Sequence, residues 1–461
     1  MYNRLIIKHL LLYSVLVVAG CSHSAIAPET ENAEIPENWA RGGDVGEVDL
    51  NWLEEFDDSA LTSLVTEAVG SNYQLKEEQA RLYQAEQTVV ATRANRFPNL
   101  SASFNASRRF SQLAAGINAL PESFGLAVNA RWDADLWGRL NKEQQAAQLT
   151  FEAQRARLES VERNLAAATT GAYFDVIEAK QLLEVAVRRL DIAEESMDIV
   201  SSGYRQGLND ALDLYQARSE VEREQAGYAQ QEQTYAEAVT TLQLGLARYP
   251  DGRLTLDGEL PVISAPIPAG LPSELLTRRA DLQESWLNLL AADATLAATH
   301  KARFPSLSLS GNYGFTTREF STLLDRDNRV WTLASGLTQP LFNAGQLKAF
   351  EEQARARVQQ AEQQYLALLY SAFADVENAI SRAGSLQQRY ESFLDAETNS
   401  AAALELALEQ YQRGLVSYTT VLVSQRQAFD AEATVVQLRN QLLQNRIDLF
   451  LSLGGEFSTD L

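Results

Sequence analysis

The sequence predicts an α+β membrane protein with an internal two-fold repeat, built from long coiled-coil helices and from β-strands that contribute to a transmembrane β-barrel. The repeat is the first observation, because three separate segments recur at one spacing of 207 residues. That period is far too long for a solenoid of short repeats. The matched segments are 96–103 with 303–310, Gly138 and Leu140 with Gly345 and Leu347, and 204–208 with 411–415. The other observations are very long helical stretches and short segments that alternate apolar with polar residues.

The composition disfavours two classes of function, nucleic-acid binding and enzymatic catalysis. The chain has 461 residues and a formal net charge of −22, whereas nucleic-acid binding through phosphate contacts needs a basic face. Its three histidines are His9, His23 and His300, and none has a nucleophile or a ligand cluster at catalytic or metal spacing. We therefore expect no enzyme activity, no metal site and no cofactor other than a covalent lipid.

The first twenty residues are typical of an export signal. Arg4 and Lys8 make a basic start, an apolar stretch follows, and small residues precede Cys21, the only cysteine. Residues 18–21, Val-Ala-Gly-Cys, resemble the bacterial lipobox, in which the cysteine is acylated and becomes the first mature residue. An ordinary secretory signal with an incidental cysteine is the alternative. Cleavage removes two basic residues and no acid, which changes the net charge from −22 to −24. Ser22 favours the outer membrane.

Composition divides the chain into five parts. We expect a lipoprotein signal peptide at 1–20, a lipid-anchored extended segment at 21–56, a first repeat at 57–249, a proline-rich equatorial linker at 250–272 and a second repeat at 273–461. Each repeat contains a helix, a strand pair and two long helices. The linker holds five of the eleven prolines, which argues against helix there.

The first helical run extends from Trp52 to about Asn95. Its apolar periodicity and its content of Ala, Gln and Glu favour one long helix. Pro98 ends the run, because proline lacks an amide proton and disfavours helix in the residue before it.

After Pro98 the apolar period changes to two. Four segments alternate in this way: 100–107, 124–133, 307–316 and 331–338. Each is close to the length of about ten residues that a tilted strand needs to cross a bilayer. The pattern fits either a half-buried soluble sheet or a barrel wall, and the polar Ser, Thr and Asn faces favour a wall around a wet lumen. Four strands cannot close a barrel, so three copies would have to supply twelve.

No stretch after the signal holds 18 consecutive apolar residues, so a membrane crossing would need a closed barrel. Instead, very long helices follow each strand pair. Residues 139–202 contain no proline, and such a helix is about 100 Å long. Seven-residue repeats come after the turns at Gly207 and Gly414, and they indicate coiled-coil packing. Their positions are Leu214, Val221, Tyr228, Tyr235 and Leu242, then Val421, Ala428, Val435, Leu442 and Leu449.

A family resemblance covers essentially the mature chain. It is carried by residues 52–56, by Arg96-Phe97-Pro98, and most strongly by Gly270-Leu271-Pro272-Ser273-Glu274-Leu275-Leu276 followed by Arg278-Arg279-Ala280-Asp281-Leu282. The chain resembles the TolC-like outer-membrane factors, in particular the lipoprotein branch related to OprM and NodT. Ala280 stands where that family usually has proline.

The resemblance implies a homotrimer with a 12-stranded barrel in the outer membrane of a Gram-negative bacterium and a helical tunnel in the periplasm. Such proteins are passive exit ducts of tripartite efflux systems. A periplasmic adaptor and an inner-membrane pump, proton-driven in this branch, would supply energy and most of the choice of small-molecule cargo. The alternatives are a structural coiled-coil envelope lipoprotein or the outer-membrane component of a protein-secretion system.

The two turns between the long helices are the candidate docking sites. The resemblance places Gly207-Leu208 and Gly414-Leu415 at the periplasmic tips that receive the adaptor. Glycine at a helix end needs no docking role, since it adopts left-handed backbone without strain. The exposed leucines beside the glycines suit a contact with the adaptor.

Residues near the turns are candidates for a periplasmic gate. Family members close the tunnel with carboxylates and with arginine and tyrosine contacts, and rings of carboxylates can bind cations. The gate candidates are Tyr204, Arg205, Asp210, Asp213, Tyr411, Arg413 and Thr420. Helix capping by Asp210 is the structural alternative. Thr420 stands where some members carry a carboxylate.

Overall fold

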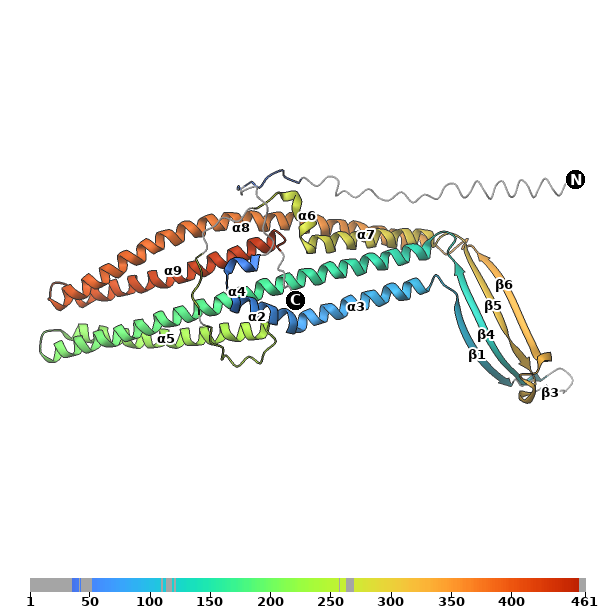
Figure 1. Ribbon diagram of the computed structural model, residues 1–461, viewed down its shortest axis with the longest axis horizontal. Helices are drawn as coiled ribbons and strands as arrows, with labels where there is room; N and C mark the ends of the chain where they lie inside the picture. Colours follow the sequence, from blue (N-terminus) through green and yellow to red (C-terminus); the bar gives the residue numbers. More distant parts are fainter. Residues whose placement is uncertain are drawn as a thin grey trace. The chain divides into compact units, whose positions relative to one another are not determined.

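The structure is a computed structural model that contains a four-stranded sheet and several long helices (Figure 1). It describes residues 35–40, 42, 52–108, 111–112, 118–119, 122–256, 258–262 and 269–455. The predicted signal peptide and the predicted lipid anchor at Cys21 lie outside these ranges. Within these ranges, we find no helix that combines the length and the apolar character needed to cross a bilayer.

The long helices of the two sequence halves have equal lengths. α4 (Arg139–Arg205) and α8 (Gln346–Gln412) each contain 67 residues, and α5 (Ala211–Gly245) and α9 (Tyr418–Ser452) each contain 35. None of the four contains proline, which would remove a backbone hydrogen bond and kink the helix. The predicted helical stretches are therefore continuous over their whole length.

The helical run predicted from Trp52 to Asn95 is divided into three elements, which corrects the expectation of one helix. They are η3 (Trp52–Phe56), α2 (Ser59–Ser71) and α3 (Tyr73–Ala94). Asn72 separates α2 from α3, because its ψ of 131° is extended and its side-chain oxygen accepts the amides of Gln74 and Leu75 at 2.8 and 3.2 Å. Asparagine competes with helix by such local bonds, and apolar periodicity does not reveal the break.

The described chain forms two compact units. The first contains Arg81–Arg155 and Glu284–Ala367, and the second contains Glu34–Ala80, Ala156–Gln283 and Leu368–Leu461, apart from the residues outside the described ranges. Each unit draws residues from both sequence halves.

The first unit contains a four-stranded antiparallel sheet of order β1-β4-β5-β6. Its strands are β1 (Asn99–Arg108), β4 (Glu122–Ala134), β5 (Ser306–Thr317) and β6 (Arg329–Thr338). They lie side by side in Figure 1, and they correspond to the four segments of period two. β2 (Ser111–Gln112) and β3 (Asn118–Ala119) form a further short ladder where a loop was expected.

The sheet has one apolar and one polar face. Ser101, Asn129, Asn312 and Thr332 lie opposite one another across the four strands. Asn312 Nδ2 donates to Asn129 Oδ1 at 2.7 Å, and Asn129 Nδ2 donates to Ser103 Oγ at 3.0 Å. Because successive side chains point to opposite faces, the neighbouring positions form the apolar face, which contains Leu100, Phe104, Leu126, Val128, Tyr313, Trp331, Leu333 and Leu337.

The second unit is packed around aromatic side chains. Trp52 of η3 stacks on Phe450 of α9 with ring centroids 6.2 Å apart, and Phe56 contacts Phe174 of α4 at 5.0 Å. Apolar residues of α2, α4, α5 and α9 complete this core. The segment that begins at Trp52 is therefore a buried part of the fold.

Candidate functional site

The turns that join the long helices have the same backbone conformation. Gly207 has a φ of +75° and Gly414 a φ of +71°. The amide of Leu208 donates to the carbonyl of Gly203 at 2.9 Å, and the amide of Leu415 donates to the carbonyl of Gln410 at 2.9 Å. Glycine at such a position, followed by this longer hydrogen bond, is a Schellman motif. The glycines are thus explained by the helix ends, while the leucines are not.

Leu208 and Leu415 extend from these turns into solvent. Their exposed fractions are 76% and 69%, although exposure of a large apolar side chain to water is unfavourable. This observation keeps the pair as docking candidates.

Asp210 caps α5. Its Oδ1 accepts the amide of Asp213 at 2.9 Å, a bond that satisfies a free amide of the first helical turn. In the second turn Ser417 precedes α9, and its hydroxyl lies 3.3 Å from Thr420 Oγ1. Helix capping thus accounts for Asp210, whereas capping does not explain Asp213, which remains a candidate for the periplasmic gate.

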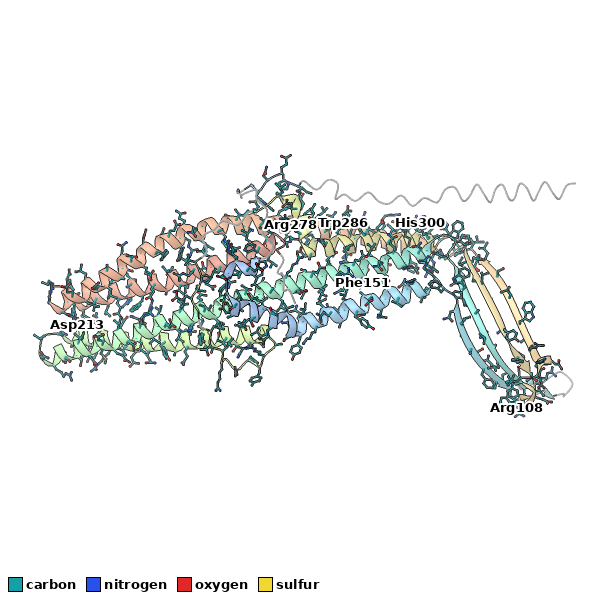
Figure 2. All side chains as sticks on the ribbon, viewed as in Figure 1. Arg108, Phe151, Asp213, Arg278, Trp286 and His300 are labelled. Carbon is teal, nitrogen blue, oxygen red and sulfur yellow. The ribbon has the colours of Figure 1, made fainter. Side chains whose placement is uncertain are left out.

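Asp213 lies in the first turn of α5 (Figure 2), and its charge acts on a pair of tyrosines, Tyr411 and Tyr418. The rings of Tyr411 and Tyr418 are 5.6 Å apart. Burial raises the pKa of Tyr418 to about 12, and Tyr411 and Asp213 add to the shift. Burial followed by the charge of Asp213 raises the pKa of Tyr411 as well. Burial and then Asp210 raise the pKa of Asp213. The fold thus brings four polar groups from two separate turns together.

Tyr418 was not a candidate in the sequence, yet it is one of the most buried side chains near the turns. It belongs to an apolar cluster with Val200 of α4, Leu214 of α5 and Val421 of α9. Its position in the first repeat is occupied by Ala211, so the repeat did not indicate it. An aromatic residue at the start of α9 was the one available signal.

The other gate candidates make local contacts in the described chain. Arg205 donates to Ser202 Oγ at 3.1 Å, and Arg413 forms an ion pair with Glu409 of the preceding turn. Tyr204 is half-exposed and Thr420 is exposed. Among the described residues of one copy, neither arginine forms a hydrogen bond or an ion pair with Asp210 or Asp213.

An acidic groove lies beside the turns. Its volume is about 1030 Å³. It is lined by carboxylates on one side of α4 and by side chains of the two turns, among them Asp191, Glu194, Glu195, Asp198, Leu208, Tyr411 and Arg413. The spacing of the four acids, three or four residues apart, was a signal in the sequence that went unused.

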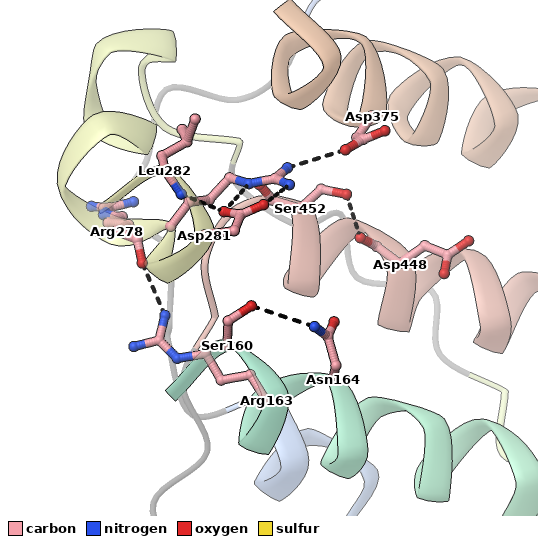
Figure 3. A network of polar contacts seen from close by, with 10 residues as sticks. Ser160, Arg163, Asn164, Arg278, Asp281, Leu282, Asp375, Asp448 and Ser452 are labelled. Atoms are coloured by element: carbon pink, nitrogen blue, oxygen red, sulfur yellow. Dashed lines mark hydrogen bonds and ion pairs between the residues drawn. The ribbon is translucent and has the colours of Figure 1, made fainter. Parts of the chain in front are cut away.

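The Arg278–Asp281 motif forms a polar network in the second unit (Figure 3). Arg279 Nη2 lies 2.8 Å from Asp281 Oδ2, and its Nη1 lies 3.2 Å from Asp375 Oδ2 on α8. Arg163 of α4 donates to the carbonyls of Arg278 and Gly454 at 2.9 and 3.2 Å. The motif therefore joins α4, α8 and the end of α9, which is a structural role.

A sheet with one apolar and one polar face, connected to very long helical hairpins, is the architecture of an outer-membrane channel. The model of the family "Outer membrane efflux protein" matches residues 64–248 and 271–455. The chain belongs to this family.

Named relatives agree with that assignment over nearly the whole chain. The cation efflux system protein CusC of Escherichia coli O6:H1 is 28% identical, covering 95% of this chain and 96% of CusC. The probable outer membrane lipoprotein SilC of Salmonella typhimurium is 28% identical, covering 97% and 98%. The solved structure of the outer-membrane channel OprN superposes with a TM-score of 0.86 at 25% identity, covering 95% and 99%. The protein is an outer-membrane efflux channel.

Proposed function

We propose that three copies of this chain form the exit duct of a tripartite efflux system, with their sheets closed into one 12-stranded barrel. The observation that carries the proposal is the sheet, whose apolar face suits lipid and whose polar face suits a wet lumen. In the described chain β1 and β6 each have a neighbour on one side only. An open sheet edge is not tolerated in the hydrocarbon core, so neighbouring copies must cover these edges.

The long helices would continue the duct as a periplasmic tunnel. α4 and α8 contain 67 residues each, which at about 1.5 Å per residue is on the order of 100 Å. That length exceeds a bilayer several-fold. Buried heptad positions on α9, such as Val421, Ala428 and Val435, support coiled-coil packing of the helices within each copy.

The turns at Gly207 and Gly414 would receive a periplasmic adaptor, which connects the duct to an inner-membrane pump. Exposed Leu208 and Leu415 would supply the apolar contact, and the acidic groove nearby would favour a cationic helical partner. Electrostatic complementarity of this kind speeds association and selects partners. A proton-driven pump follows from the family branch that the chain resembles.

Asp210 and Asp213 would restrict the closed tunnel. Three copies around an axis would place each carboxylate in a ring of three. Such a ring attracts cations, and the repulsion between its negative charges opposes the close approach of the carboxylates. Tyr411 and Tyr418 would hold the Asp213 turn against the second turn, and Tyr204, Arg205, Arg413 and Thr420 would face the neighbouring copies. A lipid on Cys21 would add an anchor to the outer membrane.

Native mass spectrometry of the detergent-extracted mature protein tests the trimer. We expect the mass of three acylated chains. A monomer that stays folded in detergent would leave the sheet edges open in lipid, and the barrel would then be wrong.

A further inference from the structure

The loop between β5 and β6 closes the end of its hairpin that lies away from the helices. α7 (Ala280–Lys301) ends shortly before β5 begins, and α8 begins shortly after β6 ends. Both helices therefore join one end of the hairpin, and residues 318–328 connect the two strands at the other end. In the proposed duct, whose helices stand in the periplasm, this loop lies at the outer surface of the outer membrane.

The loop packs against the apolar face of the sheet. Phe320 of η5 (Phe320–Thr322) makes edge-to-face contacts with Phe124 of β4 and Phe104 of β1, with ring centroids 5.5 and 6.3 Å apart. Phe104 lies on the apolar face, and Phe124 lies on it as well, because it is two positions from Leu126. The loop is therefore held on the side of the sheet that suits lipid, away from the polar face.

Arg329, the first residue of β6, lies on the same face at the end of the apolar rows. It is opposite Phe315 of β5, which is opposite Leu126 of β4, and Trp331 follows on this face with 74% exposure. From Leu307 to Phe315 the apolar positions of β5 extend about 27 Å at about 3.4 Å per residue. A strand tilt of about 40° reduces this to roughly 21 Å of membrane depth, close to the apolar band of about 25 Å in such barrels. Arg329 therefore lies at the boundary of the band, where its charge can reach lipid headgroups.

The guanidinium of Arg329 is oriented by one hydrogen bond and keeps its other donors available. Its Nε donates to the carbonyl of Arg326 at 2.9 Å. Among the described residues, neither Arg326 nor Arg329 forms an ion pair, although residues 319–327 also include three exposed acids. The charges of residues 318–329 cancel, so attraction of an anion here depends on these two guanidiniums and not on the net charge of the loop.

We propose that Arg329 and Arg326 bind the phosphate group of a lipid in the outer leaflet of the outer membrane. This inference rests on the proposed function, which places the apolar face in lipid and the helices in the periplasm. The acyl chains of the lipid lie along the exposed rings beside the arginines, which belong to Tyr313, Phe320 and Trp331. Aromatic side chains are typical of this level of an outer-membrane barrel.

The chemistry of the two halves of the site favours a phosphorylated lipid over a free anion. A planar guanidinium donates two parallel hydrogen bonds to phosphate oxygens, and the rings of Phe320 and Trp331 offer apolar surface directly beside it. Inorganic phosphate satisfies the guanidiniums alone, whereas a phosphorylated lipid also covers the rings. A lipid bound there holds the β5–β6 loop on the lipid side of the wall, away from the lumen.

Native mass spectrometry of the detergent-extracted mature protein, titrated with diphosphorylated lipid A, measures this binding. We expect up to three lipids per trimer, and at least about five-fold weaker binding of the same lipid without its phosphates. Arg329→Gln should weaken binding of the phosphorylated lipid at least about five-fold, and Arg329→Lys by less, since lysine keeps the charge but not the forked donors. The matched control is Arg131→Gln, which should bind like the parent, because Arg131 is an exposed arginine on the polar face, opposite Ser310.

Equal affinity of the parent and of Arg329→Gln for phosphorylated lipid A would overturn the site, and so would equal affinity of the parent for the dephosphorylated lipid. Full displacement of the lipid by an equal concentration of inorganic phosphate would assign the site to a free anion and overturn the lipid. Arg326→Gln, which lies outside the strands, should also weaken binding, and it tests the site if Arg329→Gln does not assemble. A monomeric mass for the parent would instead refute the proposed duct, so the two failures are distinguishable.

Discussion

The side-chain amide of Asn440 on α9 donates a 2.6 Å hydrogen bond to Glu178 Oε2 on α4. The same nitrogen donates to Asp175 Oδ1 at 2.8 Å, and Gln444 Nε2 donates to that oxygen at 2.9 Å. Two carboxylates on one side of α4 therefore meet two amides of α9. The pKa of Glu178 is raised to about 7, mainly by burial and also by the charge of Asp175, although the bond from Asn440 acts to lower it.

Glu178 should make the stability of the channel depend on pH. Its folded-state pKa lies above the ordinary value of 4.5, so the folded protein binds a proton more tightly than the unfolded one. Stability should fall as the pH rises from 4.5 to about 7 and remain lower above that. Glu178→Gln should flatten this dependence and stabilise the protein at pH 8 by on the order of 1 kcal/mol, a value reduced because the side chain is only half-buried.

Thermal unfolding at pH 5 and pH 8 measures this effect. The control is Glu184→Gln, an exposed position on the same helix, which should keep the parent's pH dependence. Equal pH dependence in the parent and in the Glu178 variant would contradict the prediction.

Arg279 should be needed for the stability of the second unit. Its guanidinium contacts Asp281, Asp375 and the Ser452 carbonyl, and its side chain is largely buried. Lysine cannot reproduce this forked geometry. Arg279→Lys should cost on the order of 2 kcal/mol, measured by denaturant unfolding. Arg278→Lys, at the neighbouring position that pairs with Glu274, should cost well under half as much. Similar losses of unfolding free energy in the two variants would contradict the prediction that Arg279 contributes more to stability than Arg278.

Export should depend on the leucines of the turns. Replacing Leu208 and Leu415 together with Glu should abolish export, because charged side chains would remove the apolar contact with the adaptor. Drug or metal susceptibility of cells measures export, and native mass spectrometry checks that the trimer still assembles. Leu324→Glu is the control, since Leu324 is 67% exposed but lies in the β5–β6 loop. Normal export by the double variant would refute docking at these leucines.

The conductance of the closed tunnel should depend on Asp210 and Asp213. The double change to Asn removes both charges but keeps the cap of α5, since asparagine caps helices as well as aspartate does. We expect several-fold higher conductance in planar bilayers and weaker block by divalent cations. Asp191→Asn, in the acidic groove on α4, should behave like the parent. Unchanged conductance in the double variant would show that these carboxylates do not restrict the closed tunnel.

Periodicity predicted most of the secondary structure because it follows from local geometry. Alternation with period two identified β1, β4, β5 and β6, and the absence of proline identified α4. The helical break at Asn72 was missed, since asparagine ends a helix by side-chain bonds that leave apolar spacing unchanged. The ladder of β2 and β3 was missed because two-residue strands carry too few positions for a period.

The sequence by itself determined the repeat, the family and the positions of the turns, because these depend on residues near one another or at a constant offset. Only the tertiary structure decided that Asp213 meets Tyr411 and Tyr418, and that Asn440 meets Glu178. It also decided that Asn129 of β4 lies opposite Asn312 of β5, where strands from the two repeats pair. Such contacts join residues about 180 to 270 positions apart, and no local pattern encodes which partner a buried polar group finds when distant helices and strands pack.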